Sequence, residues 1–261
     1  MYIGLTSYAA CPRAEQFLEN AARMGIDGVE PYVRGPDDRL LMLPEDELHA
    51  LRERAVKLGV RIPSTCLSAF NRDASLVESD GISRAVELIR RVLDLSHALG
   101  APLMLLCSYL KSNPDTEEKK TNMIRVVEEI LPYAAQRDIR IGLESPLPAN
   151  ELMAVVQTIN SDLVGVYFDT GNAVANGYDP VEEIEVLKKD IFQVHIKDSY
   201  SLQLSGLHMG DGDVDFAATV AALTRIGYDE WLMIDTSGED EQAVREDIRT
   251  LRELWVEDKV T

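Results

Sequence analysis

The sequence predicts an α/β protein whose single domain, residues 1–261, is a (β/α)8 TIM barrel. Short runs rich in Val, Ile, Leu, Phe and Tyr alternate with longer segments of helical periodicity along the whole chain, as in parallel strands joined by helices. Eight such units share 261 residues, and 261/8 gives about 33 residues each, which fits a barrel of ~250 residues. The first strand runs into Thr6 and Ser7 without a glycine-rich phosphate loop, which disfavours a doubly wound open sheet.

The expected strands and helices follow one another in order. Runs of five or six β-rich residues, mostly bounded by Gly, Pro, Asp or Ser, predict strands at residues 2–6, 28–32, 60–64, 103–107, 140–144, 164–169, 192–197 and 231–235. Apolar residues at helical spacing predict helices at residues 14–24, 45–58, 82–99, 116–136, 151–159, 181–187, 216–226 and 241–254. Several of these helices are expected to stop at a glycine, namely Gly25, Gly59, Gly100 and Gly227.

The composition limits the classes of partner. Asp and Glu outnumber Lys and Arg by 45 to 26, which gives a formal charge of −19. Phosphate backbones and anionic lipids are held by clustered Lys and Arg, so we expect no nucleic-acid and no membrane partner. Three separated cysteines, Cys11, Cys66 and Cys107, are typical of reduced thiols, and residues 1–5 lack the pattern of a signal peptide. A cytoplasmic protein that binds a small molecule is therefore expected.

The fifth to eighth strands each carry, at or near the C-terminal end, a side chain that can bind a metal. These side chains are Glu144, Asp169, His195 and Asp235. Active sites of such barrels lie where the strands end, and three carboxylates meeting there would repel one another without a cation. Oxygen ligands with one nitrogen favour Mn²⁺ or Mg²⁺, with Co²⁺ and Zn²⁺ as alternatives. A single carboxylate at a strand end is more often a cap or an ion-pair partner, but four successive strands favour a site.

These residues and several motifs resemble the xylose-isomerase-like superfamily of sugar phosphate isomerases and epimerases. The motifs occur in the right order over essentially the whole chain, at residues 25–30 (GIDGVE), 168–172 (FDTGN), 195–198 (HIKD) and 210–216 (GDGDVDF). The resemblance implies one divalent metal ion held by Glu144, Asp169, His195 and Asp235, with Glu144 and Asp235 also acting as the acid–base pair. It implies an isomerase or epimerase that acts on a small sugar, sugar phosphate or polyol-derived ketone through a metal-stabilised enediolate. Members of the superfamily often form homodimers or homotetramers.

Two residues depart from the superfamily pattern. Asp235 stands where Glu is usual, which shortens the reach of the carboxylate by one methylene. Metal binding tolerates this change better than proton transfer does, because a general base must come within hydrogen-bond distance of its proton. Asn172 stands where the ketohexose 3-epimerases of the superfamily have a His, which argues against a sugar epimerase in the narrow sense.

Four further polar residues are candidates for substrate binding: Glu30, Asn172, Lys197 and His208. Glu30 ends the second strand, where it could hydrogen-bond a substrate hydroxyl or orient a neighbouring ligand. Lys197 could contact a sugar oxygen or a phosphate, or it could form a salt bridge with Asp198 or Asp211. His208, in the glycine-rich loop after the seventh strand, is either a substrate contact or a mobile surface residue.

The remaining polar residues are expected to be structural. His49 and His97 are assigned to surface or packing positions on helices, Cys66 and Cys107 to buried positions without chemistry, and residues 229–247 chiefly to the solvated face of the last helix. Charges in loops are usually solvated, but one of four loop cations at the expected active-site face could hold a phosphate, namely Arg34, Arg39, Arg72 or Lys111.

Three other functions are compatible with this scaffold. A dehydratase resembling inosose or dehydroshikimate dehydratases would use similar ligands and the same first step, removal of an α-proton. An endonuclease-like hydrolase with three zinc ions would need several more histidines than the four in this chain. A non-catalytic sugar-binding barrel is the third alternative, and the shorter carboxylate of Asp235 gives it some weight.

Overall fold

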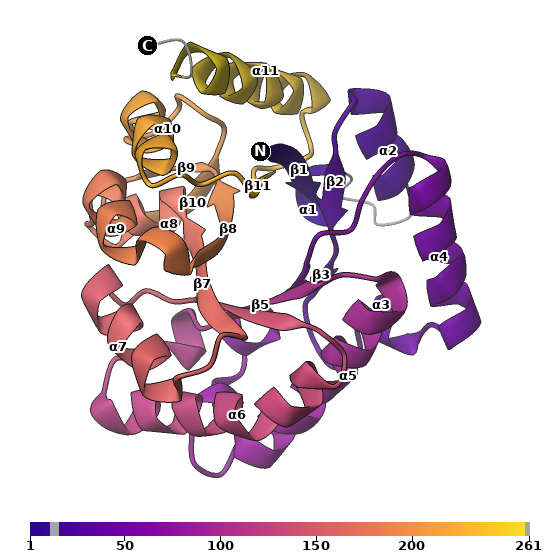
Figure 1. Ribbon diagram of the computed structural model, residues 1–261, viewed down its shortest axis with the longest axis vertical. Helices are drawn as coiled ribbons and strands as arrows, with labels where there is room; N and C mark the ends of the chain where they lie inside the picture. Colours follow the sequence, from indigo (N-terminus) through magenta and orange to yellow (C-terminus); the bar gives the residue numbers. More distant parts are fainter. Residues whose placement is uncertain (11–15, 259–261) are drawn as a thin grey trace. The chain divides into compact units, whose positions relative to one another are not determined.

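The computed structural model describes residues 1–10 and 16–258, and its contacts divide the chain into two compact units. Unit 1 comprises residues 1–29 and 167–261, and unit 2 comprises residues 30–166. Figure 1 follows the alternation of strands and helices along the chain. Cys11 and the start of the predicted helix at 14–24 lie outside the described residues. The prediction that residues 1–261 form one domain stays a prediction.

Unit 1 contains five neighbouring strands of the main sheet. In sheet order these are β2 (Gly28–Glu30, without its last residue), β1 (Tyr2–Thr6), β11 (Trp231–Ile234), β8 (Ile191–Ile196) and the second half of β7 (Val164–Asp169). The pairs β1–β11 and β11–β8 are parallel, with Ile3 opposite Leu232 and Met233 opposite His195. Most of these strand residues are buried, which explains the almost continuous apolar runs in the sequence.

Unit 2 contains the other strands of the sheet. Their order is β3 (Tyr32–Val33), β4 (Thr65–Leu67), β5 (Leu103–Cys107), β6 (Arg140–Glu144) and the first half of β7. All four pairings are parallel, and the β5–β6 ladder places Cys107 opposite Glu144.

The strands follow the order β2-β1-β11-β8-β7-β6-β5-β4-β3, which confirms the predicted (β/α)8 fold class. The two ends of this order, β2 and β3, are consecutive in the chain and together replace the single strand predicted at 28–32. Only Pro31 separates them. Proline has no N–H to donate to a ladder, so the strand is interrupted there.

Helices connect the strands in both units. Unit 1 has α1 (Ser7–Ala10), α2 (Phe17–Met24), α8 (Thr170–Ala175), α9 (Pro180–Leu187), α10 (Phe216–Arg225), α11 (Glu241–Asp258) and the 3-10 turn η4 (Lys188–Asp190). Unit 2 has α3 (Arg39–Met42), α4 (Glu45–Lys57), α5 (Ile82–Leu99), α6 (Glu117–Ala135), α7 (Ala149–Ile159) and the 3-10 turns η1 (Ala69–Asn71), η2 (Ala74–Leu76) and η3 (Leu110–Ser112). All four predicted stop glycines have positive φ angles, and Gly25 and Gly100 are the C-caps of α2 and α5.

Two predictions about strands need correction. The strand predicted at 60–64 is wrong, because β4 begins at Thr65, after Pro63. The apolar residues Val60 and Ile62 are buried before the ladder begins, which explains why they imitate a strand. The antiparallel hairpin of β9 (Asp198–Tyr200) and β10 (Gln203–Leu207) was not predicted.

Asp198 holds the glycine-rich loop after this hairpin. Its carboxylate accepts hydrogen bonds from the backbone N–H groups of Ser199, Gly210, Gly212 and Val214, at 2.9 to 3.0 Å. Asp198 is fully buried, so these donors replace its hydration. The carboxylate is thereby committed to loop structure, and the predicted alternative of a Lys197–Asp198 salt bridge is not what the structure shows.

Gly212→Ala is expected to destabilise unit 1 by about 1–3 kcal/mol, because overpacking forces neighbouring groups apart. A Cβ on Gly212 would meet the Asp198 carboxylate and the backbone oxygen of Ser199, which lies only 2.6 Å away. Denaturant unfolding measures the change. Gly35→Ala is the matched control, since no atom lies within 4 Å of the added Cβ, and equal effects of both substitutions would contradict the prediction.

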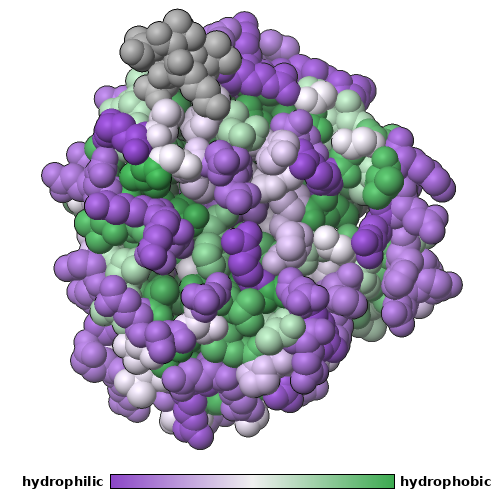
Figure 2. Space-filling model, viewed as in Figure 1, coloured by the Kyte–Doolittle hydropathy of each residue, from purple (hydrophilic) through white to green (hydrophobic). Residues whose placement is uncertain are grey.

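The visible surface is largely polar. Figure 2 shows a face dominated by hydrophilic residues, with hydrophobic residues in smaller patches between them. Among the described residues, no helix combines the length and the apolar character needed to cross a membrane.

Candidate functional site

Asp169, the last residue of β7, turns one carboxylate oxygen toward other polar side chains. Its Oδ1 accepts a hydrogen bond from the backbone N of Asn172 at 2.8 Å and so caps α8. Its Oδ2 lies 2.7 Å from Lys197 Nζ and 3.6 Å from His195 Nδ1. The side chain is 1% exposed, so this second oxygen is aimed at partners within unit 1.

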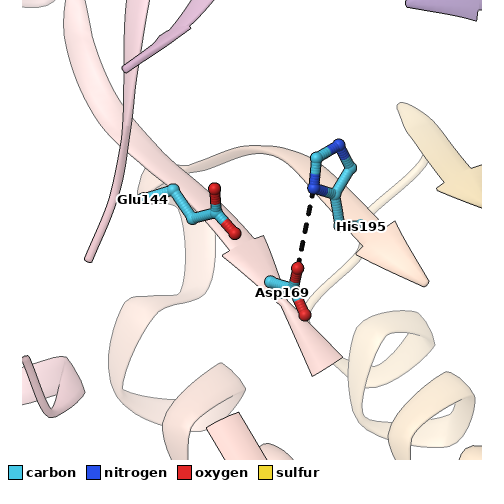
Figure 3. A group of neighbouring side chains, drawn as sticks. All are labelled: Glu144, Asp169 and His195. Atoms are coloured by element: carbon cyan, nitrogen blue, oxygen red, sulfur yellow. Dashed lines mark ion pairs between the residues drawn. The ribbon is translucent and has the colours of Figure 1, made fainter. Parts of the chain in front are cut away.

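His195 lies in the middle of this group. It occupies the fifth position of β8, and its ring packs edge-on against Tyr167, with ring centroids 4.5 Å apart. Its Nδ1 faces the Oδ2 atoms of both Asp169 and Asp235, at 3.6 and 3.9 Å, and Figure 3 draws the His195–Asp169 pair. The imidazole nitrogen therefore faces two carboxylate oxygens at distances longer than a hydrogen bond.

Lys197 joins the two carboxylates. Its ammonium group lies 2.7 Å from Asp169 Oδ2 and 3.2 Å from Asp235 Oδ2. The prediction that placed its salt bridge on Asp198 or Asp211 is wrong, because the side chain is only 11% exposed and turns into the group. The structure places Asp169, His195 and Asp235 near one another in unit 1, with Lys197 paired to both carboxylates.

Electrostatics keeps Asp169 ionised. Burial opposes the charged form, but Lys197 and His195 together outweigh burial and lower the pKa of Asp169 below its ordinary value. Unit 1 therefore presents the ionised carboxylate of Asp169 beside the carboxyl group of Asp235, one imidazole and the Lys197 side chain in a largely buried space.

Glu144 ends β6 in unit 2, where it is 4% exposed. Cys107 Sγ donates a hydrogen bond to its Oε2 at 2.9 Å, and the backbone oxygen of Glu144 accepts a hydrogen bond from Ser108 N at 2.9 Å. The carboxylate is therefore held by the neighbouring strand.

The contact between Cys107 and Glu144 was not predicted from the sequence. The sulfur of Cys107 lies 3.7 Å from that of Cys66, and both are buried thiols that are not joined in a disulfide. Burial first, and then Cys66 and Glu144, raises the pKa of the Cys107 thiol well above its ordinary value. The neighbouring position of Cys107 and Glu144 on paired strands was the signal that could have indicated this contact.

We expect Cys107 to resist alkylation by iodoacetamide in the folded protein at mildly alkaline pH, because the thiolate is the reactive form. Peptide mass spectrometry should find it unmodified until denaturant is added. Since its folded-state pKa is raised, its contribution to stability should be intact below the unfolded pKa of ~8.5 and decline as the pH rises above that value. Rapid labelling of Cys107 in the native protein would contradict this expectation.

Glu30 and the loop cations belong to unit 2. Glu30 is fully buried, and Ser64 Oγ donates a hydrogen bond to its Oε2 at 2.5 Å. The four cations considered for a phosphate are exposed, namely Arg34, Arg39, Arg72 and Lys111. His49 and His97 are exposed on their helices, which confirms their surface assignment.

His208 is neither a mobile surface residue nor free of partners. Its Nδ1 lies 2.6 Å from Asp247 Oδ2, and its side chain is 20% exposed. The same Asp247 oxygen accepts a hydrogen bond from Thr236 Oγ1, and the second oxygen accepts one from Met209 N. Asp247 is thus a buried anchor on α11 and an exception within residues 229–247, where Asp229, Glu230, Glu239, Asp240 and Glu246 are exposed as expected.

The ligand set of unit 1 fits a divalent cation. In unit 1, His195 Nδ1 lies 3.6 Å from Asp169 Oδ2 and 3.9 Å from Asp235 Oδ2, and carboxylate oxygens with an imidazole nitrogen are ligands that Mn²⁺, Mg²⁺ or Zn²⁺ can take. Asn172, the remaining predicted residue, contributes its backbone N to the Asp169 cap and is 7% exposed.

Known proteins share this sequence and fold. The family model described as xylose isomerase-like TIM barrel matches residues 18–254. The chain is 27% identical over 234 residues to an L-ribulose-5-phosphate 3-epimerase, UlaE, of Escherichia coli, a match covering 84% of this chain and 81% of that protein. Among solved structures it is similar to a D-tagatose 3-epimerase-like protein, with 23% identity, a TM-score of 0.83 and all of both chains covered. It is also similar to an IOLI protein with a bound zinc atom, with 20% identity, a TM-score of 0.77, and 99% and 98% of the two chains covered.

Proposed function

Because the chain belongs to the xylose isomerase-like TIM barrel family, we propose that it is a divalent-metal-dependent epimerase of a small ketose or ketose phosphate. The observation that carries the proposal is the buried group in unit 1, in which His195 Nδ1 faces the carboxylates of Asp169 and Asp235. The names of relatives support epimerisation over isomerisation or dehydration, since the UlaE relative and the D-tagatose 3-epimerase-like protein are both named for it. These names also outweigh the argument from Asn172 against an epimerase.

We propose Glu144 as the fourth ligand of this metal centre. β6 pairs in parallel with the first half of β7 as far as Leu143 and Val166, and the two strands end at Glu144 and Asp169. Parallel strands present their carboxyl ends on the same edge, where barrel enzymes hold their catalytic residues. Mn²⁺ or Mg²⁺ is favoured by the oxygen ligands, while the zinc atom of the IOLI protein supports Zn²⁺ as an alternative.

In the proposed reaction the metal ion would polarise the substrate, and side chains of the protein would transfer the protons. A bound divalent cation would act as a Lewis acid toward the substrate carbonyl oxygen. Glu144 would remove the proton from the carbon next to that carbonyl, and the Cys107 hydrogen bond would fix the orientation of its carboxylate. Asp235, protonated from solvent before this step, would donate its proton to the opposite face, which inverts the configuration of that carbon and leaves Glu144 protonated and Asp235 ionised.

Among the remaining expectations, Glu30, Asn172, Lys197 and His208 are proposed to contact the substrate or its surroundings. Their structural contacts, described above, support this role most for Lys197, which lies among the proposed ligands. A phosphate on the substrate, a cytoplasmic location and a homodimer or homotetramer stay predictions.

Turnover in deuterated water tests the function. The protein, loaded in turn with Mn²⁺, Mg²⁺ and Zn²⁺, would be incubated with ketopentoses, ketohexoses and their phosphates, and the products followed by proton NMR. We expect a 3-epimer with one deuterium at carbon 3. Loss of water would identify a dehydratase instead, and no exchange with any substrate or metal would overturn the enzymatic proposal.

A further inference from the structure

We propose that Lys197 competes with the divalent cation for Asp169 and Asp235, so that metal binding must displace its ammonium group from these carboxylates. The inference rests on the proposed metal centre and concerns how one residue of this chain controls whether a metal ion occupies that centre. It makes Lys197 a positioning residue and counterion of the centre.

The geometry places the ammonium group on the oxygens that a metal would need. Lys197 Nζ lies 2.7 Å from Asp169 Oδ2 and 3.2 Å from Asp235 Oδ2. These are the same two oxygens that face His195 Nδ1. The other oxygen of Asp169 accepts the hydrogen bond that caps α8, so Oδ2 is the atom available to a cation.

The Lys197 ammonium group and a divalent metal ion would repel each other if both lay next to Asp169 Oδ2 and Asp235 Oδ2. Asp169 is 1% exposed and Asp235 is 12% exposed, so water screens little of the repulsion between an ammonium group and a divalent ion. A buried carboxylate without a cation is equally unfavourable. The protein avoids that second cost when no metal is bound, because Lys197 neutralises the carboxylates itself.

Two consequences follow from the exchange of one cation for another. Removing the charge of Lys197 should strengthen metal binding, because the carboxylates no longer have a resident competitor. It should also lower the folding stability of the metal-free protein, because Asp169 and Asp235 lose their counterion. A lysine that only contacted substrate would produce neither effect.

The test is an equilibrium titration with Mn²⁺ of the wild-type protein and of Lys197→Met, which preserves the length of the side chain without its charge. We expect Mn²⁺ to bind Lys197→Met at least about 10-fold more tightly. Without metal, the melting temperature of the variant should fall below that of the wild type, and saturating Mn²⁺ should raise it by more than it raises the wild type. Lys189→Met is the matched control, since it removes one positive charge from an exposed residue before β8, at the opposite end of the strand.

Equal Mn²⁺ affinity of wild type and Lys197→Met would overturn the competition while leaving the proposed metal centre in place. Absence of Mn²⁺, Mg²⁺ and Zn²⁺ binding in both proteins would overturn the metal centre and, with it, this inference. If Lys197→Met does not fold, a wild-type crystal soaked in MnCl₂ decides the question. Displacement of Nζ beyond hydrogen-bond distance of Asp169 Oδ2 supports the proposal, and a bound Mn²⁺ with the ion pair intact overturns it.

Discussion

Glu144→Gln is expected to lower kcat for epimerisation by about 10²–10⁴-fold, the usual contribution of a general acid–base residue. The amide has nearly the shape of the carboxylate and can still accept the hydrogen bond from Cys107, but it cannot take up a proton. The buried position at the end of β6 should therefore be preserved while the chemistry is lost. Loss of a charged ligand should also weaken metal binding, so turnover must be compared at saturating metal.

Two measurements and one control variant separate the loss of proton transfer from the loss of metal binding. Solvent deuterium exchange into the substrate follows proton removal directly, and a Mn²⁺ titration follows the metal. Glu129→Gln, on the exposed face of α6, makes the same chemical change outside the site and should leave both unchanged. Turnover of Glu144→Gln at the wild-type rate would contradict the acid–base role of Glu144.

The group in unit 1 was largely predictable because it depends on strand ends. Asp169 and Asp235 directly follow buried apolar runs, and parallel strands carry such residues to one edge. The ion pairs of Lys197 with Asp169 and Asp235 were not predictable. Alternation along a strand indicates on which side of the sheet a side chain lies, but not which carboxylates lie next to it. The Cys107–Glu144 hydrogen bond likewise depends on the register of two strands separated by a long helix.

Two further predictions, the strand at 60–64 and the exposure of Asp247, differ from the structure for local reasons. Val60 and Ile62 suggested a strand, but Pro63 delays the ladder to Thr65. Asp247 was grouped with solvated acidic residues by composition alone. It lies three residues after Val244 and four before Leu251, both buried, so helical periodicity would have placed it on the inner face of α11.

Asp169→Asn and Asp169→Ala should separate the two tasks of this residue. Both remove the charge opposite Lys197, and loss of one partner of a buried ion pair costs about 3–5 kcal/mol. Both should also abolish tight Mn²⁺ binding. Asparagine can still accept the hydrogen bond from Asn172 N, whereas alanine cannot, so the alanine variant should lose a further ~1 kcal/mol from the α8 cap.

The exposed Asp215 provides the control for the cap, because its Oδ1 accepts the hydrogen bond from Ala218 N in α10. Asp215→Ala should lower the free energy of unfolding by about 1 kcal/mol, and Asp215→Asn should change it little.

The pH dependence of stability gives an independent check on Asp169. Because its folded-state pKa is lowered, the stability it confers is present above the unfolded pKa of ~3.9 and is lost as the pH falls through the lower, folded value. The difference in unfolding free energy between wild type and Asp169→Asn should therefore shrink in acid. A difference that stays constant down to the folded pKa would mean that the charge of Asp169 does not stabilise unit 1, and the account of Lys197 as its counterion would fail with it.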